Sequence, residues 1–311
     1  MNRLLIISIC LLPTCLFSQH LPDSLRHWHR GGMVAINFTQ SSFTNWSTGG
    51  ENSISGQGLL EFFVNYKKDS TTWDNSIDFA YGVLHQGKDK FTRKTDDKID
   101  FTSKYGHYAF RRIWYYSALL SFKTQFSPGY NYSDDTLKTL ISEFMSPGYS
   151  LFAIGLDYKP NKKISFFFSP VTLKTTYVMN QTLADAGSFG VEKATYDNAG
   201  SKIKDGQQIR NELGSYVRFQ YKSEIMKNVS LFTRCELFSN YLKDPQNIDI
   251  NAELMLSMKV NKYISASFNV HGVYDNDVMI AVDKNNDGIL DGVGPRFQLK
   301  QVLGVGFSAK F

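Results

Sequence analysis

Alternation of apolar and polar residues with a period of two recurs along most of this chain and constrains its fold more than any other feature. In residues 247–260, for example, Ile250 and Leu254 fall on one face of a strand, and Asn251 and Glu253 fall on the other. One face in lipid and one in water over about 10 residues is typical of a membrane-spanning β-strand, because a closed sheet satisfies its own backbone hydrogen bonds. The sequence therefore predicts an all-β protein that forms a single antiparallel transmembrane β-barrel.

The same pattern predicts about twelve strands. Their ranges are 33–41, 52–67, 72–87, 98–109, 112–127, 149–159, 163–177, 207–223, 228–242, 247–260, 262–275 and 296–311. Short turns alternate with longer loops between them, and outer-membrane barrels place their short turns in the periplasm. We therefore expect both termini to be periplasmic. A soluble sandwich or lipocalin-like barrel is the alternative, but strands in such folds average about 5 to 6 residues and their outward faces are polar.

The beginning of the chain predicts export. Residues 1–18 resemble a secretory signal peptide, in which Arg3 precedes an apolar run over residues 4–17 that is too short for a membrane helix. Its removal would leave residues 19–311 as the outer-membrane β-barrel and Cys235 as the remaining cysteine, so we expect no intramolecular disulfide.

The composition agrees with this prediction. A content of 17 Tyr, 24 Phe and 4 Trp suits the aromatic girdles of a membrane barrel. The net charge of +5 is spread along the chain without a basic cluster, so we expect no nucleic-acid partner.

The last predicted strand places Phe307 and Phe311 on its apolar face, with Phe311 at the terminus. This resembles the C-terminal signature of bacterial outer-membrane proteins, which the barrel-insertion machinery reads. The expected partners are therefore that machinery and the lipid and lipopolysaccharide of the cell outer membrane. A protein partner in the same membrane is also possible.

Several short motifs are spread over nearly all of the chain after the signal peptide. They are Asn45-Trp46, Gly49-Gly50-Glu51-Asn52-Ser53, Asp96-Asp97, Ser103-Lys104-Tyr105-Gly106, Thr124-Gln125-Phe126 and Gly155-Leu156-Asp157-Tyr158-Lys159-Pro160. Together they resemble a family of predicted outer-membrane barrels from Bacteroidota that is defined by a domain of unknown function. The resemblance implies export, a barrel and an outer-membrane location, and it carries over no catalytic or binding residue.

A candidate calcium loop lies near the C-terminus. Oxygen-bearing side chains occupy positions one, three, five and nine of the loop, and Gly288 occupies position six, where a calcium loop turns tightly around its ion. The bidentate glutamate expected at position twelve is replaced by Gly294. Two interpretations remain open, a weak calcium site or a solvated turn. No cofactor is required, and the candidate ligands for calcium are Asp283, Asn285, Asp287 and Asp291.

Charged residues on the predicted lumen face form two arcs of opposite sign. Acidic residues on the early strands are Glu61, Asp74, Asp78 and Asp100. Basic residues on the later strands are Arg210, Arg218, Lys222 and Arg234, with Glu212, Glu236, Asp249 and Glu253 among them. The arcs could face each other across open water and form the transverse field of a polar-solute pore, or they could pair and close the lumen.

A lipid-modifying hydrolase of the phospholipase or lipid A deacylase type would require a serine, a histidine and an orienting group. The predicted strands separate His85 from His107 by about 20 Å, at roughly 3.3 Å per residue. His271 faces the lumen opposite Asn251 or Glu253, which fits a lumen hydrogen bond better than an oriented catalytic imidazole. We therefore expect a non-enzymatic outer-membrane protein, either a structural or assembly component or a small polar-solute channel, with the hydrolase as the alternative.

Overall fold

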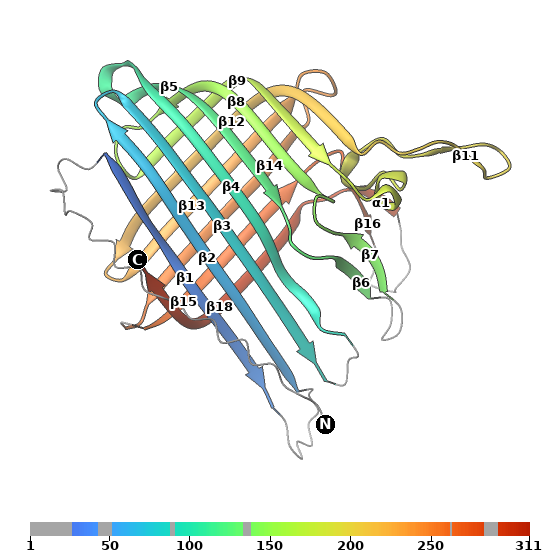
Figure 1. Cartoon of the computed structure of the whole chain (residues 1–311), viewed down its shortest axis with the longest axis horizontal. Helices are drawn as coiled ribbons and strands as arrows, with labels where there is room; N and C mark the ends of the chain where they lie inside the picture. Colours follow the sequence, from blue (N-terminus) through green and yellow to red (C-terminus); the bar gives the residue numbers. More distant parts are fainter. Residues whose placement is uncertain (1–26, 43–51, 88–90, 133–137, 262, 283–291) are drawn as a thin grey trace, which may run out of the picture.

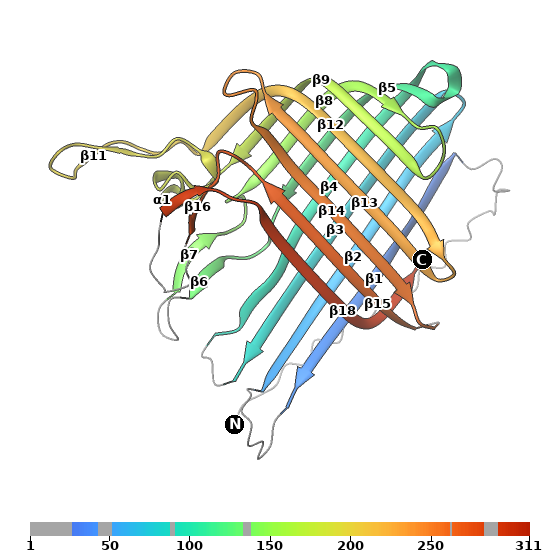
Figure 2. The same cartoon turned by 180° about the vertical axis from the view of Figure 1, so that it is seen from behind.

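The computed structural model describes residues 27–42, 52–87, 91–132, 138–261, 263–282 and 292–311. In this part of the chain, twelve strands close into one antiparallel barrel. Neighbouring strands follow one another in chain order around the ring, and β1 pairs with β18 to complete it, with Met33 opposite Lys310. The prediction of a single antiparallel all-β barrel is confirmed, and Figures 1 and 2 show its two walls from opposite sides.

Each predicted strand range overlaps one barrel strand, in the same order. The barrel strands are β1 (Trp28–Ser41), β2 (Ser53–Lys68), β3 (Thr71–Gln86), β4 (Arg93–Phe110), β5 (Trp114–Thr124), β8 (Gly148–Tyr158), β9 (Ile164–Tyr177), β12 (Ile209–Met226), β13 (Val229–Asn240), β14 (Ile248–Lys259), β15 (Ile264–Tyr274) and β18 (Gln298–Lys310).

The connections differ sharply between the two ends of the barrel. Short connections at residues 69–70, 111–113, 159–163, 227–228 and 260–263 define what we call the turn end. Asp69 and Asn228 there adopt φ values of 47° and 64°, a left-handed conformation that Asp and Asn tolerate better than most residues. The long connections gather at the opposite end, which we call the loop end (Figure 1).

The loop end carries secondary structure that the sequence pattern did not predict. Three small two-stranded sheets and two short helices lie there among the described residues. They are β6 (Gly129–Tyr132) with β7 (Lys138–Ser142), β10 (Thr195–Tyr196) with β11 (Lys202–Lys204), β16 (Met279–Val282) with β17 (Gly292–Pro295), α1 (Gln181–Asp185) and the 3₁₀ helix η3 (Ser188–Gly190). At the turn end, a further 3₁₀ helix, η2 (Arg111–Ile113), joins β4 to β5.

The outward face of the barrel is apolar and exposed. On β18, for example, Leu303 and Phe307 are 68% and 67% exposed, whereas Lys300 and Val302, of the opposite parity, line an interior cavity. Other large apolar side chains with exposed surfaces lie on nearly every barrel strand. No helix among the described residues is long and apolar enough to cross a bilayer.

A β-bulge in β9 changes which residues of that strand face outward. Gly214 pairs with Thr172 but Tyr216 pairs with Ser169, so two residues of β9, Pro170 and Val171, oppose one residue of β12. Proline cannot donate to a ladder hydrogen bond and is therefore confined to edges and bulges within sheets. The bulge therefore changes which alternate residues of β9 face outward: Phe166 and Phe168 before Pro170, and Val171 and Leu173 after it.

Part of the interior is filled by an apolar cluster from the β5–β13 wall. Its buried members are Leu119, Ala153, Phe167, Tyr216 and Phe238. The Phe167 and Tyr216 rings meet edge to face at 6.2 Å. The remaining interior contains mostly polar and charged side chains, which define the candidate site.

Candidate functional site

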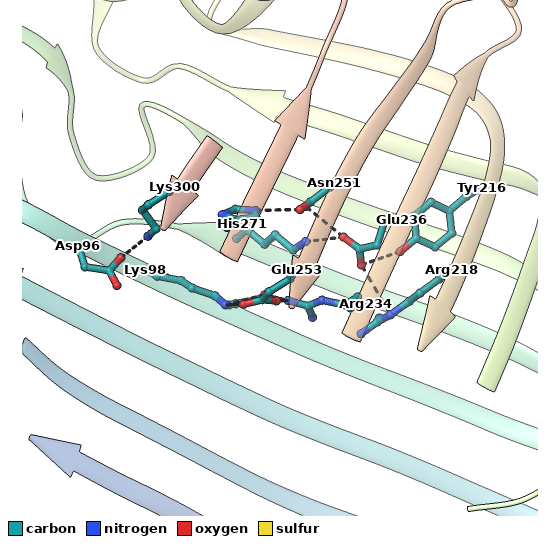
Figure 3. Close-up of polar contacts among 12 residues, drawn as sticks. Asp96, Lys98, Tyr216, Arg218, Arg234, Glu236, Asn251, Glu253, His271 and Lys300 are labelled. Carbon is teal, nitrogen blue, oxygen red and sulfur yellow. Dashed lines mark hydrogen bonds and ion pairs between the residues drawn. The ribbon is translucent and has the colours of Figure 1, made fainter. Parts of the chain in front are cut away.

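Charged side chains from opposite walls meet inside the lumen. The Arg234 guanidinium lies 2.9 Å from Asp100 and 2.5 Å from Glu253, and Lys98 Nζ lies 3.1 Å from Glu253. Beside them, Lys123 Nζ lies 2.7 Å from Glu236. We call this group the central layer, and its members are Lys98, Asp100, Lys123, Arg234, Glu236 and Glu253. Figure 3 labels Lys98, Arg234, Glu236 and Glu253 among them.

The central layer spans the full width of the barrel. Lys98 stands on β4 and Glu253 on β14, six steps apart around the ring of twelve strands and therefore directly opposite each other. Contacts between neighbouring strands would hold only one wall together. The Lys98–Glu253 and Arg234–Asp100 pairs instead join opposite walls and place side chains across the path along the barrel axis.

Two interior cavities lie on either side of this layer. The turn-side cavity is about 740 Å³, and the loop-side cavity is about 410 Å³. The residues that line both are Lys98, Arg234, Glu253 and His271. The central layer and His271 therefore form a partition between the two halves of the lumen.

Neutral hydrogen-bonding groups extend the partition around Glu236. Tyr216 Oη donates to one carboxylate oxygen of Glu236 at 2.8 Å, and Asn251 Nδ2 donates to the other at 3.1 Å. His271 Nε2 lies 2.8 Å from Asn251 Oδ1, which makes a continuous chain from β15 to β12 (Figure 3). Such connected polar networks favour one geometry, because a buried group left without its partner is costly.

The innermost charges of the central layer, those of Asp100, Arg234 and Glu236, are removed from bulk water. Asp100 and Arg234 are only 2% and 6% exposed. Desolvation of two charges costs several kcal/mol per ion, and close pairing offsets that cost only when both partners remain. Loss of either partner would therefore leave the other with a single remaining ion pair, Asp100 with Lys98 or Arg234 with Glu253.

Two further ion-pair clusters lie above and below the partition. The loop-end cluster centres on Lys174, which lies 2.6 Å from Asp249, and on Arg210, which lies 3.0 Å from Glu212. Asp275 and Asp277 complete that cluster. The turn-end cluster joins Lys104 to Asp157 at 2.6 Å and Lys159 to Asp74 at 2.9 Å.

The loop-end segment between β9 and β12 reaches the loop-side cavity, which its Phe189 lines. Val178, Leu183, Ala184 and Val191 form a small buried cluster of their own around α1. Arg210 Nη1 donates to the carbonyl of Gly190 at 3.0 Å, which ties this segment to the loop-end cluster.

Outside the barrel wall, Asp185 at the end of α1 has a clearly lowered pKa. The Asp185 carboxylate accepts hydrogen bonds from Lys202 Nζ at 2.7 Å, from Gln181 Nε2 at 2.7 Å and from the Gly206 backbone N–H at 2.8 Å. These donors, Lys202 first, lower the pKa of Asp185 from its ordinary value of 3.8 to about 2.

The charged residues predicted to line the lumen occupy distinct places. Asp100, Arg234, Glu236 and Glu253 lie in the central layer, with Arg218 and His271 at its edge; Arg210, Glu212 and Asp249 lie in the loop-end cluster and Asp74 in the turn-end cluster. Glu61, Asp78 and Lys222 line the turn-side cavity, and none of them forms an ion pair with another described residue.

The candidate calcium ligands Asp283, Asn285, Asp287 and Asp291 lie outside the described residues, and calcium binding stays a prediction. Among the described residues, no group of three or more His, Cys, Asp or Glu side chains could hold a metal ion. Phe307 is exposed on the outward face. Phe311 stacks on Phe62, and its backbone N–H donates to the Gly32 carbonyl at 3.1 Å.

Sequence reasoning missed several lysines that hold the network together. Lys98 and Lys104 share the inward parity of Asp100 on β4, at distances of two and four residues, so the signal was present in the alternation. Lys123, Lys159 and Lys174 were missed in the same way. Their inclusion shows that the two signs are interleaved on β4 rather than segregated into separate arcs.

Comparisons with known proteins describe the chain in general terms. A family described as "Protein of unknown function (DUF3078)" matches residues 38–130. No curated protein matches the sequence.

Solved structures similar to this chain include three from bacteria. An outer membrane channel from Pseudomonas putida F1 is 10% identical, with 91% of this chain and 94% of that chain covered and a TM-score of 0.36. The translocator domain of autotransporter NalP from Neisseria meningitidis is 10% identical, with 89% and 86% covered and a TM-score of 0.32. The beta domain of the Bordetella autotransporter Brka is 7% identical, with 92% and 98% covered and a TM-score of 0.31.

Proposed function

We propose that this chain is an outer-membrane β-barrel with a non-enzymatic role, and that the central layer closes its lumen in the state described. The membrane location is supported by the exposed apolar face that surrounds the barrel. Continuous apolar surfaces larger than a few hundred Å² are rare on soluble monomers and mark contact with a membrane or a partner. Outer-membrane lipid and lipopolysaccharide are the partners that would cover this face.

The proposed orientation follows from the two ends. The turn end, where β1 begins and β18 ends, would face the periplasm, because outer-membrane barrels keep their short turns on that side. Export through the predicted signal peptide and insertion through the Phe307 and Phe311 signature are parts of the same proposal. The small sheets of the loop end would then face the cell exterior.

The central layer is the observation that carries the closed lumen. A solute that moves from the turn-side cavity to the loop-side cavity must separate Arg234 from Asp100 or Lys98 from Glu253. Each separation removes a close partner from a charge inside the lumen; Asp100, for example, would keep only Lys98 at 3.7 Å. We therefore expect no steady ion conductance from the wild-type barrel in a planar lipid bilayer.

The experiment that tests this closure removes equal numbers of cations and carboxylates from the central layer, so that no excess charge of either sign remains. Replacing Lys98, Arg234 and Glu253 together with serine, while Asp100 is replaced with asparagine, removes both cross-lumen pairs and should produce measurable conductance. Lys204→Ser on the loop-end hairpin is the control and should remain silent. Steady, ion-selective conductance of the wild type would identify an open polar-solute channel instead.

A structural or assembly role is the second candidate, favoured by the hairpin of β10 and β11. This hairpin projects away from the barrel in Figure 1, and its Tyr196 and Ile203 side chains are exposed. Replacing both with serine should abolish co-purification of a specific outer-membrane protein if the hairpin binds one. Unchanged co-purification would assign the partner to another surface.

The lipid hydrolase alternative has less support from the histidine geometry. His107 Nδ1 lies 3.2 Å from Thr71 Oγ1 at the turn end, and His271 bonds Asn251 in the partition. Among the described residues, neither histidine hydrogen-bonds a carboxylate that would orient it as a general base. Release of labelled fatty acid by the refolded barrel would nonetheless establish the hydrolase, and we expect none.

A further inference from the structure

The turn-side cavity contains two carboxylates that the ion-pair network leaves out. Glu61 on β2 stands directly opposite Asp78 on β3, and Asp78 stands opposite Asp100 on β4. Arg234 neutralises Asp100, but Glu61 and Asp78 make no hydrogen bond or ion pair with another described residue. Lys98 and Lys310 line the same cavity without coming within ion-pair distance of either carboxylate. Like charges directly opposite each other destabilise a sheet, so this wall favours a bound cation.

The opposite wall carries lysines that also lack an ion-pair partner among the described residues. Arg218, Gln220 and Lys222 alternate along the inward face of β12. The backbone N–H of Lys222 donates to the carbonyl of Lys163 at 2.8 Å, which places two lysines side by side at the mouth of the cavity. Among the described residues, neither lysine has a carboxylate within ion-pair distance.

Arg218 is a buried cation on this wall, with a donor that could bind a ligand. Its side chain is about nineteen-twentieths buried and lines the turn-side cavity, yet its Nε has no hydrogen-bond acceptor. The closest carboxylate oxygen, on Glu236, is 3.6 Å away and already accepts from Tyr216. A buried guanidinium with a free donor is costly unless an acceptor reaches it.

The two walls face each other. Strands β2 and β12 are six steps apart in the ring of twelve, and the cavity between them is about 740 Å³, within the range of small-molecule sites. We propose that the turn-side cavity binds a small molecule that carries both an ammonium group and a carboxylate group, such as an amino acid or a short peptide. Its ammonium group lies against Glu61 and Asp78, and its carboxylate lies against Arg218, Lys222 and Lys163. The site lies on the turn side of the central layer, so it does not depend on whether the lumen conducts.

The test titrates the full chain, folded in detergent micelles, with triglycine and measures the heat of binding. Triglycine should bind, and the two derivatives that lack one charge, N-acetyl-triglycine and triglycine amide, should bind at least about tenfold more weakly. Comparable affinity for all three peptides, or no binding of triglycine, would overturn the proposal.

Variants assign each charge to its wall. Glu61→Gln with Asp78→Asn should weaken triglycine about tenfold and leave the affinity for N-acetyl-triglycine unchanged, because that ligand has no ammonium group to lose. Lys163→Gln with Lys222→Gln should likewise weaken triglycine about tenfold and leave the affinity for triglycine amide unchanged, because that ligand has no carboxylate to lose. Lys227→Gln, exposed at the β12–β13 turn, is the control and should bind triglycine like the wild type. Folding of each variant is checked by the circular dichroism of the barrel. Folded variants that bind all peptides equally would refute the assignment.

Discussion

Arg234 on β13 donates from Nη2 to Oδ2 of Asp100 on β4, 2.9 Å away and five steps around the ring. The same nitrogen reaches Glu253 on β14, so one guanidinium neutralises two carboxylates from different walls. The barrel is thus joined across its interior as well as around its circumference. The stability of the barrel should depend on this side chain more than on any exposed charge.

Replacement of Arg234 with glutamine should therefore lower the free energy of unfolding by about 3 to 5 kcal/mol, since Asp100 and Glu253 both lose their shortest ion pair. Lys204→Gln removes an exposed ion pair with Glu192 and should cost at most about 1 kcal/mol. Denaturant titrations followed by circular dichroism measure both. A similar loss in the two variants would contradict the dominant role of the central layer.

Two adjacent residues of β14 test the assignment of faces. Leu254 is exposed on the outward face, whereas Met255 lines the turn-side cavity. An arginine in place of an outward residue near the bilayer midplane costs about 2 to 4 kcal/mol, so Leu254→Arg should destabilise the refolded barrel by that amount. Met255→Arg should cost clearly less. Equal costs in lipid vesicles would show that the outward face does not contact lipid.

Gly155 on β8 should tolerate no side chain, because it lies against the bulge of β9. A Cβ atom at this position would lie 2.0 Å from the Phe168 carbonyl oxygen, whereas a Cβ at Gly56 on β2 would have no heavy atom within 4 Å. We expect Gly155→Ala to destabilise the barrel by about 1 to 3 kcal/mol or more. Gly56→Ala should be neutral or stabilising by up to about 1 kcal/mol. Unfolding midpoints of the two variants, measured under the same conditions, test this difference, and equal midpoints would contradict it.

The loop end should respond to acid through Asp185. Its pKa in the folded protein, about 2, is below its ordinary value of 3.8, so its contribution to loop stability is complete above about pH 4. That contribution is lost as the pH falls through about 2. Carbon-detected NMR of the Asp185 carboxyl should show a midpoint near 2 that rises in Lys202→Gln. Lys204→Gln should leave the midpoint unchanged, and a midpoint near 3.8 in the wild type would refute the proposed hydrogen bonds.

The strands and their order could be predicted from the sequence because alternation reports directly which residues share a face. Pro170 is informative for the same reason, since the change of parity around it marks the bulge. The first residues of β4 were missed, because Arg93–Asp97 are mostly polar on both faces and resemble a loop. The small sheets of the loop end were missed because strands of two to five residues carry no usable period.

The partners within the site could not be predicted. Alternation places Lys98 and Glu253 on the lumen face of their strands, but it does not say which strand stands opposite. That relationship depends on the closure of the ring and on the stagger of its strands, which no single strand encodes. The partition between two cavities follows from the same closure and is therefore a property of the whole barrel.

The length of chain between the partners of the central layer has a consequence for assembly. Lys98 and Glu253 are 155 residues apart, and Asp100 and Arg234 are 134 apart. Contacts of such separation form late, because the intervening chain must first be ordered. Interactions absent from the folding transition state act mainly by slowing unfolding. We therefore expect the central layer to set how long a completed barrel survives rather than how fast it is made, with its charges hydrated until the ring has closed.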